Sequence, residues 1–331
     1  MQQMRRSLAM YFKAKKVVSA IFIIMLAGLF LSSCAIKKPI TNIDNNKLNI
    51  VTTIFPPYDF TRQICADYAD ITMLLRPGCE AHNYEPTPKD IIKIQTCDIF
   101  IYNGGESDEW VEKILSSFDS SKIKLVKMTD AVTLYEEQQT GANNTHTHKH
   151  EHEHKTEWDE HVWTSPVNAI KICNLICDTL CNIDTDNSTV YKTNTQQYTQ
   201  KLKQLDEEFK NTVKGAKSNT LIFADRFPAR YFTEQYNLKF FAAFPGCADQ
   251  TEPSSATLAY ITDKVKLQKV KYVFYIEFSN QKIADVVCEQ TGAKKLMFNS
   301  CHNVTAQQFK KGITYLDLMR QNLKNVTEAI N

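Results

Sequence analysis

The sequence predicts an α/β fold with two lobes, each built on a parallel sheet, joined by one long linker helix. From Leu48 onward, short apolar runs alternate with helical patterns, as in strand-helix-strand units. One long helical pattern interrupts this alternation near the middle of the chain. With 331 residues, 43% of them hydrophobic, the chain is long enough for about two domains. Because open parallel sheets bind ligands beyond the carboxyl ends of their strands, we expect a site in the cleft between the lobes.

In the first lobe, four short apolar runs predict strands, at Leu48 to Ile54, Ile71 to Leu75, Ile99 to Tyr102 and Ile123 to Val126. Two helix starts are marked by a hydroxyl residue followed by proline. Thr87-Pro88 comes before an acid at position 90 and an apolar run, and Ser165-Pro166 opens a helix to Cys181. Residues 129 to 160 show no periodicity, and an irregular connection of this length usually indicates a functional or disordered loop.

The predicted linker helix runs from Ser188 to Gly215, with apolar residues at helical spacing between Tyr191 and Val213. Strand-helix alternation then restarts and ends in an amphipathic helix from about Ile313 to Ile330. The expected strands of this lobe are Thr220 to Ala224, Lys239 to Phe244, Tyr272 to Glu277 and Lys294 to Phe298. The predicted divisions are a signal peptide (1–33), a tether (34–47), an N-terminal lobe (48–186), the linker (187–216) and a C-terminal lobe (217–331).

The N-terminus resembles a bacterial lipoprotein signal. Basic residues precede the apolar run Val17 to Leu31, which is short for a membrane-spanning helix, and Leu31-Ser32-Ser33-Cys34 matches a lipobox. We therefore expect lipidation at Cys34 and an extracytoplasmic protein anchored to the cell membrane; the alternative is an uncleaved anchor. The net charge of +2 gives no reason to expect nucleic-acid binding, and a monomer is expected.

The cysteines divide into two groups. Cys173, Cys177 and Cys181 recur every fourth residue on one helix, and we interpret them, with Cys65 and Cys97, as small hydrophobic core residues. Cys247 and Cys301 lie in predicted loops, where an exported location permits either a disulfide between them or free thiols.

The histidines also form two groups. Five of the eight alternate with other polar residues in a stretch that offers no apolar face, namely His146, His148, His150, His152 and His154. Imidazole is the commonest side-chain metal ligand, so this run is interpreted either as an accessory loop that collects metal ions or as a dispensable loop.

The other three histidines, His82, His161 and His302, each follow a predicted strand, as does Asp225. We therefore expect these four side chains to form a metal site between the lobes. Three imidazoles and one carboxylate suit Zn²⁺ best and Mn²⁺ next. Glu80 and Glu277 are alternative carboxylate ligands, or residues that orient the ligating imidazoles.

The chain resembles the zinc/manganese ABC-transporter substrate-binding lipoproteins, a group that includes adhesin-like members. The motifs that carry the resemblance are VTTIFPPYDFTRQI, LLRPGCEAHNYEPTPKDI, IYNGGESDEWV, the histidine-rich loop, DEHVWTSPVNAIKI, ADRFPARYF, FYIEFSN and NSCHNV. The resemblance implies two Rossmann-like lobes bridged by a long rigid linker helix, with a metal ion held in the cleft between them. It also implies that the metal is delivered to a membrane permease driven by an ATPase, and that the protein has no enzymatic activity. By this resemblance His82 and His161 match the first two ligands. Ala224 stands at the third position, so that Asp225 serves instead, and His302 is the candidate in the last loop.

Two other functions are alternatives. His150-Glu151-x-x-His154 formally matches HExxH, which would indicate a secreted zinc metalloprotease, but the surrounding residues provide no apolar helix face. A surface adhesin is the second alternative, although no sequence feature argues for adhesion.

Overall fold

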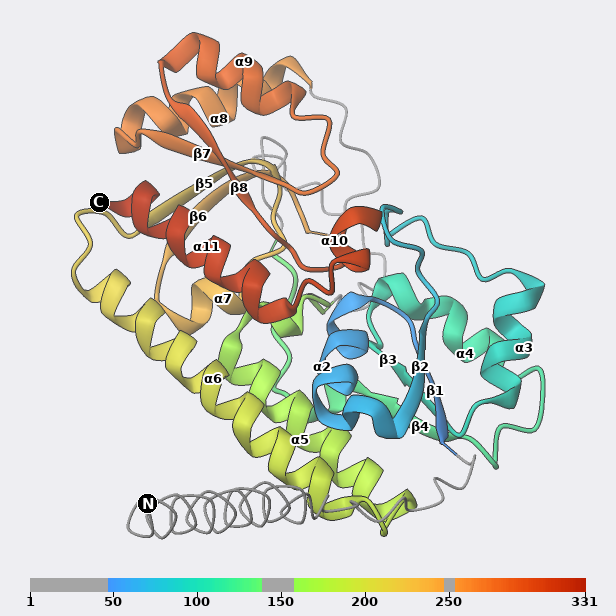
Figure 1. The fold of residues 1–331 in the computed structure, drawn as a ribbon. Coiled ribbons are helices and arrows are strands. Elements are labelled where there is room, and N and C mark those ends of the chain that lie inside the picture. Colours follow the sequence, from blue (N-terminus) through green and yellow to red (C-terminus); the bar gives the residue numbers. More distant parts are fainter. Residues whose placement is uncertain (1–46, 139–157, 247–253) are drawn as a thin grey trace, which may run out of the picture. The chain divides into compact units, whose positions relative to one another are not determined.

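The computed structural model describes residues 47–138, 158–246 and 254–331, which belong to one compact unit (Figure 1). The predicted signal peptide, Cys34, the histidine run 146–154 and Cys247 lie outside the described residues. Within the described ranges, no helix is both long and apolar enough to cross a membrane.

The first sheet is parallel, with the order β2-β1-β3-β4. Its strands are β1 (Leu48–Thr52), β2 (Ala69–Met73), β3 (Ile99–Tyr102) and β4 (Lys124–Lys127), and its helices are α2 (Phe55–Cys65), α3 (Pro88–Thr96) and α4 (Glu109–Leu115). Short 3₁₀ turns lie at η1 (Ala66–Tyr68), η2 (Glu106–Asp108) and η3 (Met128–Ala131). Helix α3 begins with the expected capping box, in which Thr87 accepts a hydrogen bond from the Asp90 amide and the Asp90 side chain accepts one from the Thr87 amide.

The second sheet is also parallel, with the order β6-β5-β7-β8. Its strands are β5 (Thr220–Arg226), β6 (Lys239–Phe244), β7 (Tyr272–Ile276) and β8 (Lys294–Phe298), and its helices are α7 (Arg230–Gln235), α8 (Ser255–Gln268), α9 (Lys282–Thr291), α10 (Ala306–Lys310) and α11 (Tyr315–Ile330). The prediction of two α/β lobes with parallel sheets is confirmed.

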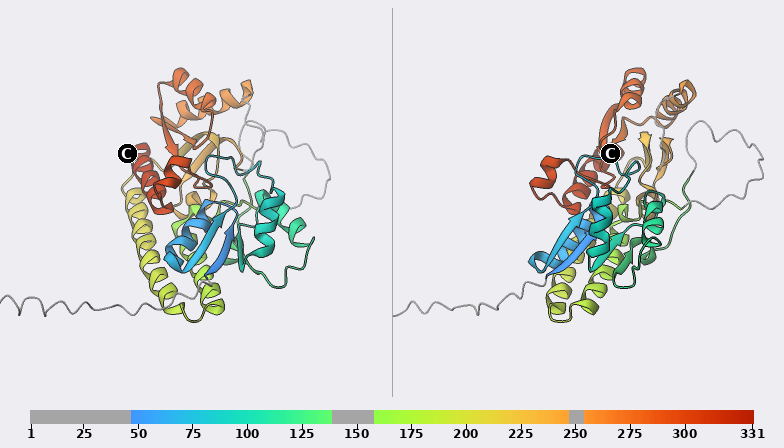
Figure 2. Two further views of the ribbon diagram at one scale, coloured as in Figure 1. Left: turned by 45° about the vertical axis from the view of Figure 1, so that its right-hand side comes forward. Right: turned by 90° about the vertical axis from the view of Figure 1, so that its right-hand side faces the viewer.

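Helices α5 (Pro166–Ile183) and α6 (Ser188–Lys214) carry the chain from the first sheet to the second and pack against each other (Figures 1 and 2). Both begin where the sequence indicated. The Ser165 hydroxyl caps α5 by accepting a hydrogen bond from the Asn168 amide. The crossover therefore consists of two packed helices and not of one long helix alone.

The lobes share one hydrophobic core. The larger cluster contains Ile50 and Ile101 of the first sheet, Phe223 and Phe298 of the second, and buried residues of α2, α5, α6 and α11. Helix α11 contacts α2 and α6 as well as β5 and β8. Since separating the lobes would expose this apolar surface, they are joined by packing as well as by the linker.

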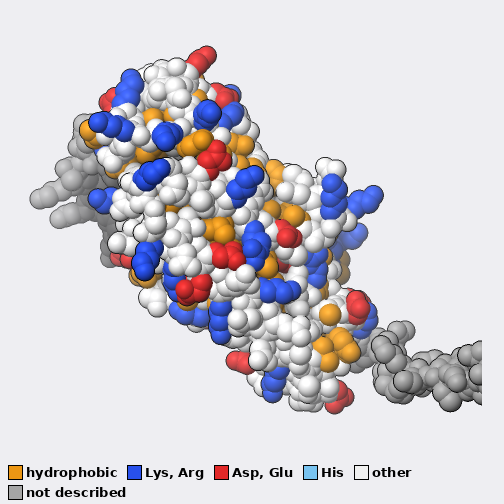
Figure 3. Space-filling model, turned by 60° about the vertical axis from the view of Figure 1, so that its left-hand side comes forward, with side chains coloured by type: hydrophobic (Ala, Val, Ile, Leu, Met, Phe, Trp, Pro, Cys, Tyr) orange, Lys and Arg blue, Asp and Glu red, His pale blue; other side chains and the backbone are white. Residues whose placement is uncertain are grey.

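The outer face of each sheet carries its own smaller core. In β5, Leu221 and Phe223 belong to the shared core, whereas Ile222 and Ala224 pack toward α8 and α9. This alternation is the two-residue period of a strand that is covered on both faces. On the face of the molecule in Figure 3, basic and acidic side chains are interspersed, in keeping with the near-neutral charge.

The structure confirms that four of the five cysteines assigned to the core are buried, and that Cys181 is half-buried. Cys301 is also fully buried, and burial raises the pKa of its thiol well above the ordinary value. Because Cys247 lies outside the described residues, its disulfide with Cys301 stays a prediction.

Candidate metal centre

Four side chains from three separate loops meet between the two sheets. They are His82, Glu160, His161 and His302, whose potential ligand atoms all lie within 4.8 Å of one another. His82 lies between β2 and α3, Glu160 and His161 immediately precede the 3₁₀ turn that leads into α5, and His302 lies between β8 and α10. Each loop follows the carboxyl end of a strand, which explains why residues so distant in sequence converge.

His161 is fully buried and held from both sides. Its Nδ1 lies 3.0 Å from Oδ1 of Asp159, which also accepts a hydrogen bond from the His161 amide at 2.9 Å. The centre of a Trp163 ring lies 5.7 Å from the centre of the imidazole. The 3₁₀ turn η5 (Val162–Thr164) then leads directly into α5. This arrangement turns Nε2 away from Asp159, and Nε2 is buried without a hydrogen-bond partner among the residues that the structure describes.

His302 is held through a serine. The Ser300 hydroxyl donates a hydrogen bond to Oε1 of Glu277 at 2.6 Å, and its oxygen lies 3.1 Å from Nδ1 of His302. Because a hydroxyl has one proton to donate, the Ser300 oxygen is left to accept from Nδ1–H. The Nε2 atom of His302 then carries the free lone pair, and it too is buried without a hydrogen-bond partner.

His82 is held in the same way by Ser107. The Ser107 hydroxyl donates to Oε1 of Glu160, and its oxygen lies 3.0 Å from Nδ1 of His82. The Ser107 amide donates to the other oxygen of Glu160 at 2.8 Å. A carboxylate-serine pair therefore orients both His82 and His302, so that Nε2 is the expected ligand atom of each.

The ionisation of the cluster suits a cation. Burial lowers the pKa of His82 to about 3 and also lowers the pKa of His302, so both rings are neutral near pH 7. Burial alone would lower the pKa of His161 as well, but the Asp159 carboxylate raises it above its ordinary value. Burial would raise the pKa of Glu160, yet its interactions with the three imidazoles hold it well below its usual range. Glu160 is therefore a carboxylate with 1% of its surface exposed.

Two glycines allow backbone to approach the cluster closely. A Cβ atom on Gly105 would collide with the Cβ of Glu160, and one on Gly246 would lie 2.9 Å from Cε1 of His161. Gly105 belongs to the GGES stretch, which lacks the lysine and spacing of a phosphate loop. Its position explains the need for glycine there, since any side chain would displace Glu160.

The cluster fits a divalent metal ion. In a tetrahedral zinc site, neighbouring ligand atoms are about 3.4 Å apart, as follows from metal-ligand distances of about 2.1 Å. Nε2 of His302 lies 3.6 Å from Oε1 of Glu160, which is beyond hydrogen-bond range but close to that spacing. Buried polar atoms normally have partners, and the two partnerless Nε2 atoms of His161 and His302 would gain one from a bound metal.

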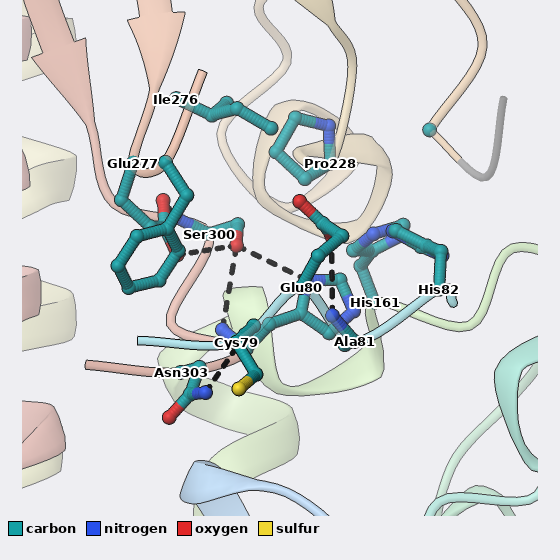
Figure 4. A pocket seen from close by; sticks show the side chains of 13 residues that line it. Cys79, Glu80, Ala81, His82, His161, Pro228, Ile276, Glu277, Ser300 and Asn303 are labelled. Carbon is teal, nitrogen blue, oxygen red and sulfur yellow. Dashed lines mark hydrogen bonds between the residues drawn. The ribbon is translucent and has the colours of Figure 1, made fainter. Parts of the chain in front are cut away.

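The three histidines of the cluster line a narrow pocket between the lobes, shown in Figure 4. The free volume at its centre is about 10 Å³, roughly that of one water-sized sphere, so it matches a single ion. Glu80, Pro228 and Glu277 also line the pocket.

The structure differs from the prediction at the carboxylate ligand. Asp225 lies at the end of β5, where Oδ1 accepts a hydrogen bond from the Arg226 amide at 2.8 Å and Oδ2 accepts one from the Ile276 amide at 3.3 Å. It is not part of the four-residue cluster found among the described residues, whereas Glu160 is. Sequence reasoning overlooked Glu160. The available signal was an acid beside His161 in the apolar context of DEHVW, which indicates a buried charge that needs a partner.

Two parallel-sheet lobes with a buried cluster of imidazole and carboxylate groups between them define a bilobed α/β protein with a candidate metal site. Residues 50–329 match the ZnuA family, which is described as the periplasmic component A of the zinc-uptake complex. The chain belongs to this family, as its motifs indicated.

Individual relatives support this family assignment. The chain is 34% identical over 305 residues to the zinc-binding lipoprotein AdcA of Streptococcus pneumoniae, an alignment covering 92% of this chain and 59% of AdcA. It is 33% identical over 316 residues to the high-affinity zinc uptake system protein ZnuA of Bacillus subtilis, covering 94% and 97% of the two chains. The crystal structure of the Zn(II)-bound ZnuA-like domain of Streptococcus pneumoniae AdcA superposes with a TM-score of 0.72 at 32% identity, covering 86% of this chain and 99% of that domain. This chain thus spans about three fifths of the length of pneumococcal AdcA. These relatives favour neither the protease nor the adhesin alternative.

Proposed function

We propose that this protein is an extracytoplasmic substrate-binding protein that captures Zn²⁺ and delivers it to an ABC-type importer. The observation that carries the proposal is the convergence of His82, His161, His302 and Glu160, with two buried imidazole nitrogens that lack hydrogen-bond partners. Zinc uptake in the names of the family and of the Bacillus subtilis relative supports the choice of cargo. Mn²⁺ is the alternative cargo.

The proposed role is binding without catalysis. Three imidazoles and one carboxylate fill the four positions of a tetrahedral ion, whereas a catalytic zinc site keeps one position for water or substrate. The shared core between the lobes favours a site that changes shape little on binding. The importer permease and its ATPase would then supply the work needed for release.

Metal titration tests the capture step. The chain without its first 34 residues should bind one Zn²⁺ tightly, in competition with a chromophoric chelator. The double substitution His82→Ala/His161→Ala should abolish this site while leaving the fold intact by circular dichroism. Tight binding by the double variant would exclude the proposed ligands. Repeating the titration with Mn²⁺ identifies the preferred ion.

The histidine run 146–154 is proposed as an accessory collector of metal ions. The residues that flank it support this role, because Glu136 and Trp158 pair in an antiparallel bridge only three residues before His161. The described residues on the two sides of the run are therefore paired close to His161. Deleting 146–154 should remove weak zinc sites and keep the tight one.

Anchoring and delivery have separate tests. Metabolic labelling with a fatty acid should mark the wild-type protein and not Cys34→Ser, which would show the proposed lipid attachment.

Deleting the permease and ATPase genes should abolish the effect of this protein on zinc-limited growth, whereas an adhesin would retain its effect. Sedimentation of the purified protein tests the expected monomer.

A further inference from the structure

Two more carboxylates line the pocket beside the four-residue cluster. Glu80 belongs to the first-lobe loop that carries His82, and Glu277 follows β7 in the second lobe. In Figure 4, Glu277 lies next to Ser300 at the edge of the pocket. The pocket therefore contains more carboxylate groups than the cluster uses.

Both oxygens of Glu80 are engaged by protein donors. Oε2 accepts from Nη2 of Arg226 at 2.9 Å, and Oε1 accepts from the Ala81 amide at 3.2 Å. Arg226 ends β5 and is only 8% exposed, whereas the Glu80 side chain is 32% exposed, so this ion pair between the two lobes is buried on the arginine side and partly open to solvent on the glutamate side. The guanidinium thus draws the Glu80 carboxylate toward the second lobe and occupies the oxygen that could otherwise bind a cation.

Glu277 is engaged in a different way. Its oxygens accept from the Ser300 amide at 2.7 Å and the Ser300 hydroxyl at 2.6 Å, and that hydroxyl also orients His302. Glu160 belongs to the ligand cluster, whereas Glu80 and Glu277 line the pocket without belonging to that cluster. The site therefore offers three nitrogen ligands and a single carboxylate.

This ligand set bears on the choice of metal. Imidazole ligands and four-coordinate geometry suit Zn²⁺, whereas Mn²⁺ favours carboxylate and water oxygens in six-coordinate sites. One more free carboxylate in the pocket would help Mn²⁺ more than Zn²⁺. A residue that keeps such a carboxylate occupied therefore affects selectivity without touching the metal.

We propose that Arg226 is a specificity-determining residue, which favours Zn²⁺ over Mn²⁺ by holding Glu80 in an ion pair and away from the metal. This inference rests on the proposed function, because it assumes that a divalent cation binds at the cluster. Arg226 acts here through Glu80 and is not itself a ligand.

The test compares Kd for Zn²⁺ and for Mn²⁺ in wild type, Arg226→Gln, Arg226→Lys and Glu80→Gln/Arg226→Gln. Removing the charge of Arg226 changes the electrostatic potential for both ions alike, since both carry two charges, so the ratio of the two Kd values isolates the ligand effect. In Arg226→Gln, the preference for Zn²⁺ should fall by roughly tenfold or more, the scale on which outer-shell partners act. Arg226→Lys, which can still pair with Glu80, should retain most of the preference.

The double variant decides the cause. It also lacks the Glu80 carboxylate, so it should regain the wild-type ratio. An unchanged ratio in Arg226→Gln would overturn the proposal, and so would a reduced ratio that the double variant fails to restore. If Arg226→Gln does not fold, Arg226→Met keeps the apolar stem and serves in its place.

The same Kd measurements distinguish an error in the role of Arg226 from an error in the proposed metal-binding function. If wild type binds neither ion tightly, or if His82→Ala/His161→Ala binds zinc as well as wild type does, the metal site itself is wrong. If wild type binds tightly and needs those histidines, an unchanged ratio in Arg226→Gln refutes only the role of Arg226.

Discussion

Replacing Glu160 with glutamine tests the part of the site that the sequence did not indicate. The amide keeps the shape of the side chain and an oxygen that can accept from Ser107, but it removes the only carboxylate of the cluster. Substituting a residue that only orients a ligand typically lowers metal affinity roughly 10- to 100-fold. Losing a direct ligand should therefore lower the affinity by at least the larger of these two factors. We expect zinc affinity to fall by at least roughly 100-fold, which corresponds to about 2.8 kcal/mol.

The assay is a competition titration with a chromophoric chelator at pH 8, at which the lowered pKa values of His82 and His302 leave both rings neutral. Glu289→Gln, on an exposed position of α9, is the matched control and should bind as wild type does. Asp225→Asn tests the ligand that the sequence had suggested, and it should leave the affinity within about threefold of wild type, because Asp225 faces the backbone of β7. A folded Glu160→Gln protein with wild-type zinc affinity would refute the assignment of Glu160 as a ligand. Loss of zinc binding in Asp225→Asn would instead indicate Asp225 as the ligand.

Three further predictions concern the orientation and protonation of the imidazoles. Zinc affinity should fall about tenfold per pH unit below the raised pKa of His161, because one proton must leave that ring, while His82 and His302 have lowered pKa values and stay neutral. Asp159→Asn removes the carboxylate that raises this pKa, so the decline should begin at lower pH, while affinity at pH 8 falls roughly 10- to 100-fold. Ser300→Ala removes the hydroxyl partner of Nδ1 in His302 and should also weaken zinc binding, roughly 10- to 100-fold.

Each of these has its own contrary outcome. An affinity that is flat between pH 8 and 5, or that drops about a thousandfold per unit, would contradict a single titrating imidazole. For Asp159→Asn, an unshifted pH profile would mean that the carboxylate does not control His161. For Ser300→Ala, circular dichroism and thermal unfolding separate a loss of zinc from a loss of fold, and wild-type affinity in a folded variant would remove the serine from the site.

Local sequence patterns were sufficient for the architecture. The period of apolar residues and the proline-marked helix starts predicted the strands and several helices to within a few residues, since strand and helix formation depend largely on near neighbours. The same reasoning placed His82, His161 and His302 in loops after strands, and a parallel sheet brings such loops to one edge. For these residues, topology alone was enough to predict that they meet.

The carboxylate depended on the tertiary structure. Asp225 and Glu160 both lie close to a predicted ligand position in the sequence, but a side chain's direction depends on backbone geometry and on neighbours that are distant in the chain. Asp225 is captured by the Ile276 amide of an adjacent strand, whereas Gly105 and Ser107, more than fifty residues away, make room for Glu160 and bind it. The packing of the two lobes against each other likewise depended on the tertiary structure. A periodic helix pattern predicts a linker, but only the folded chain shows that α11 and the shared core hold both lobes together, because burial of apolar surface is a property of contacts between elements.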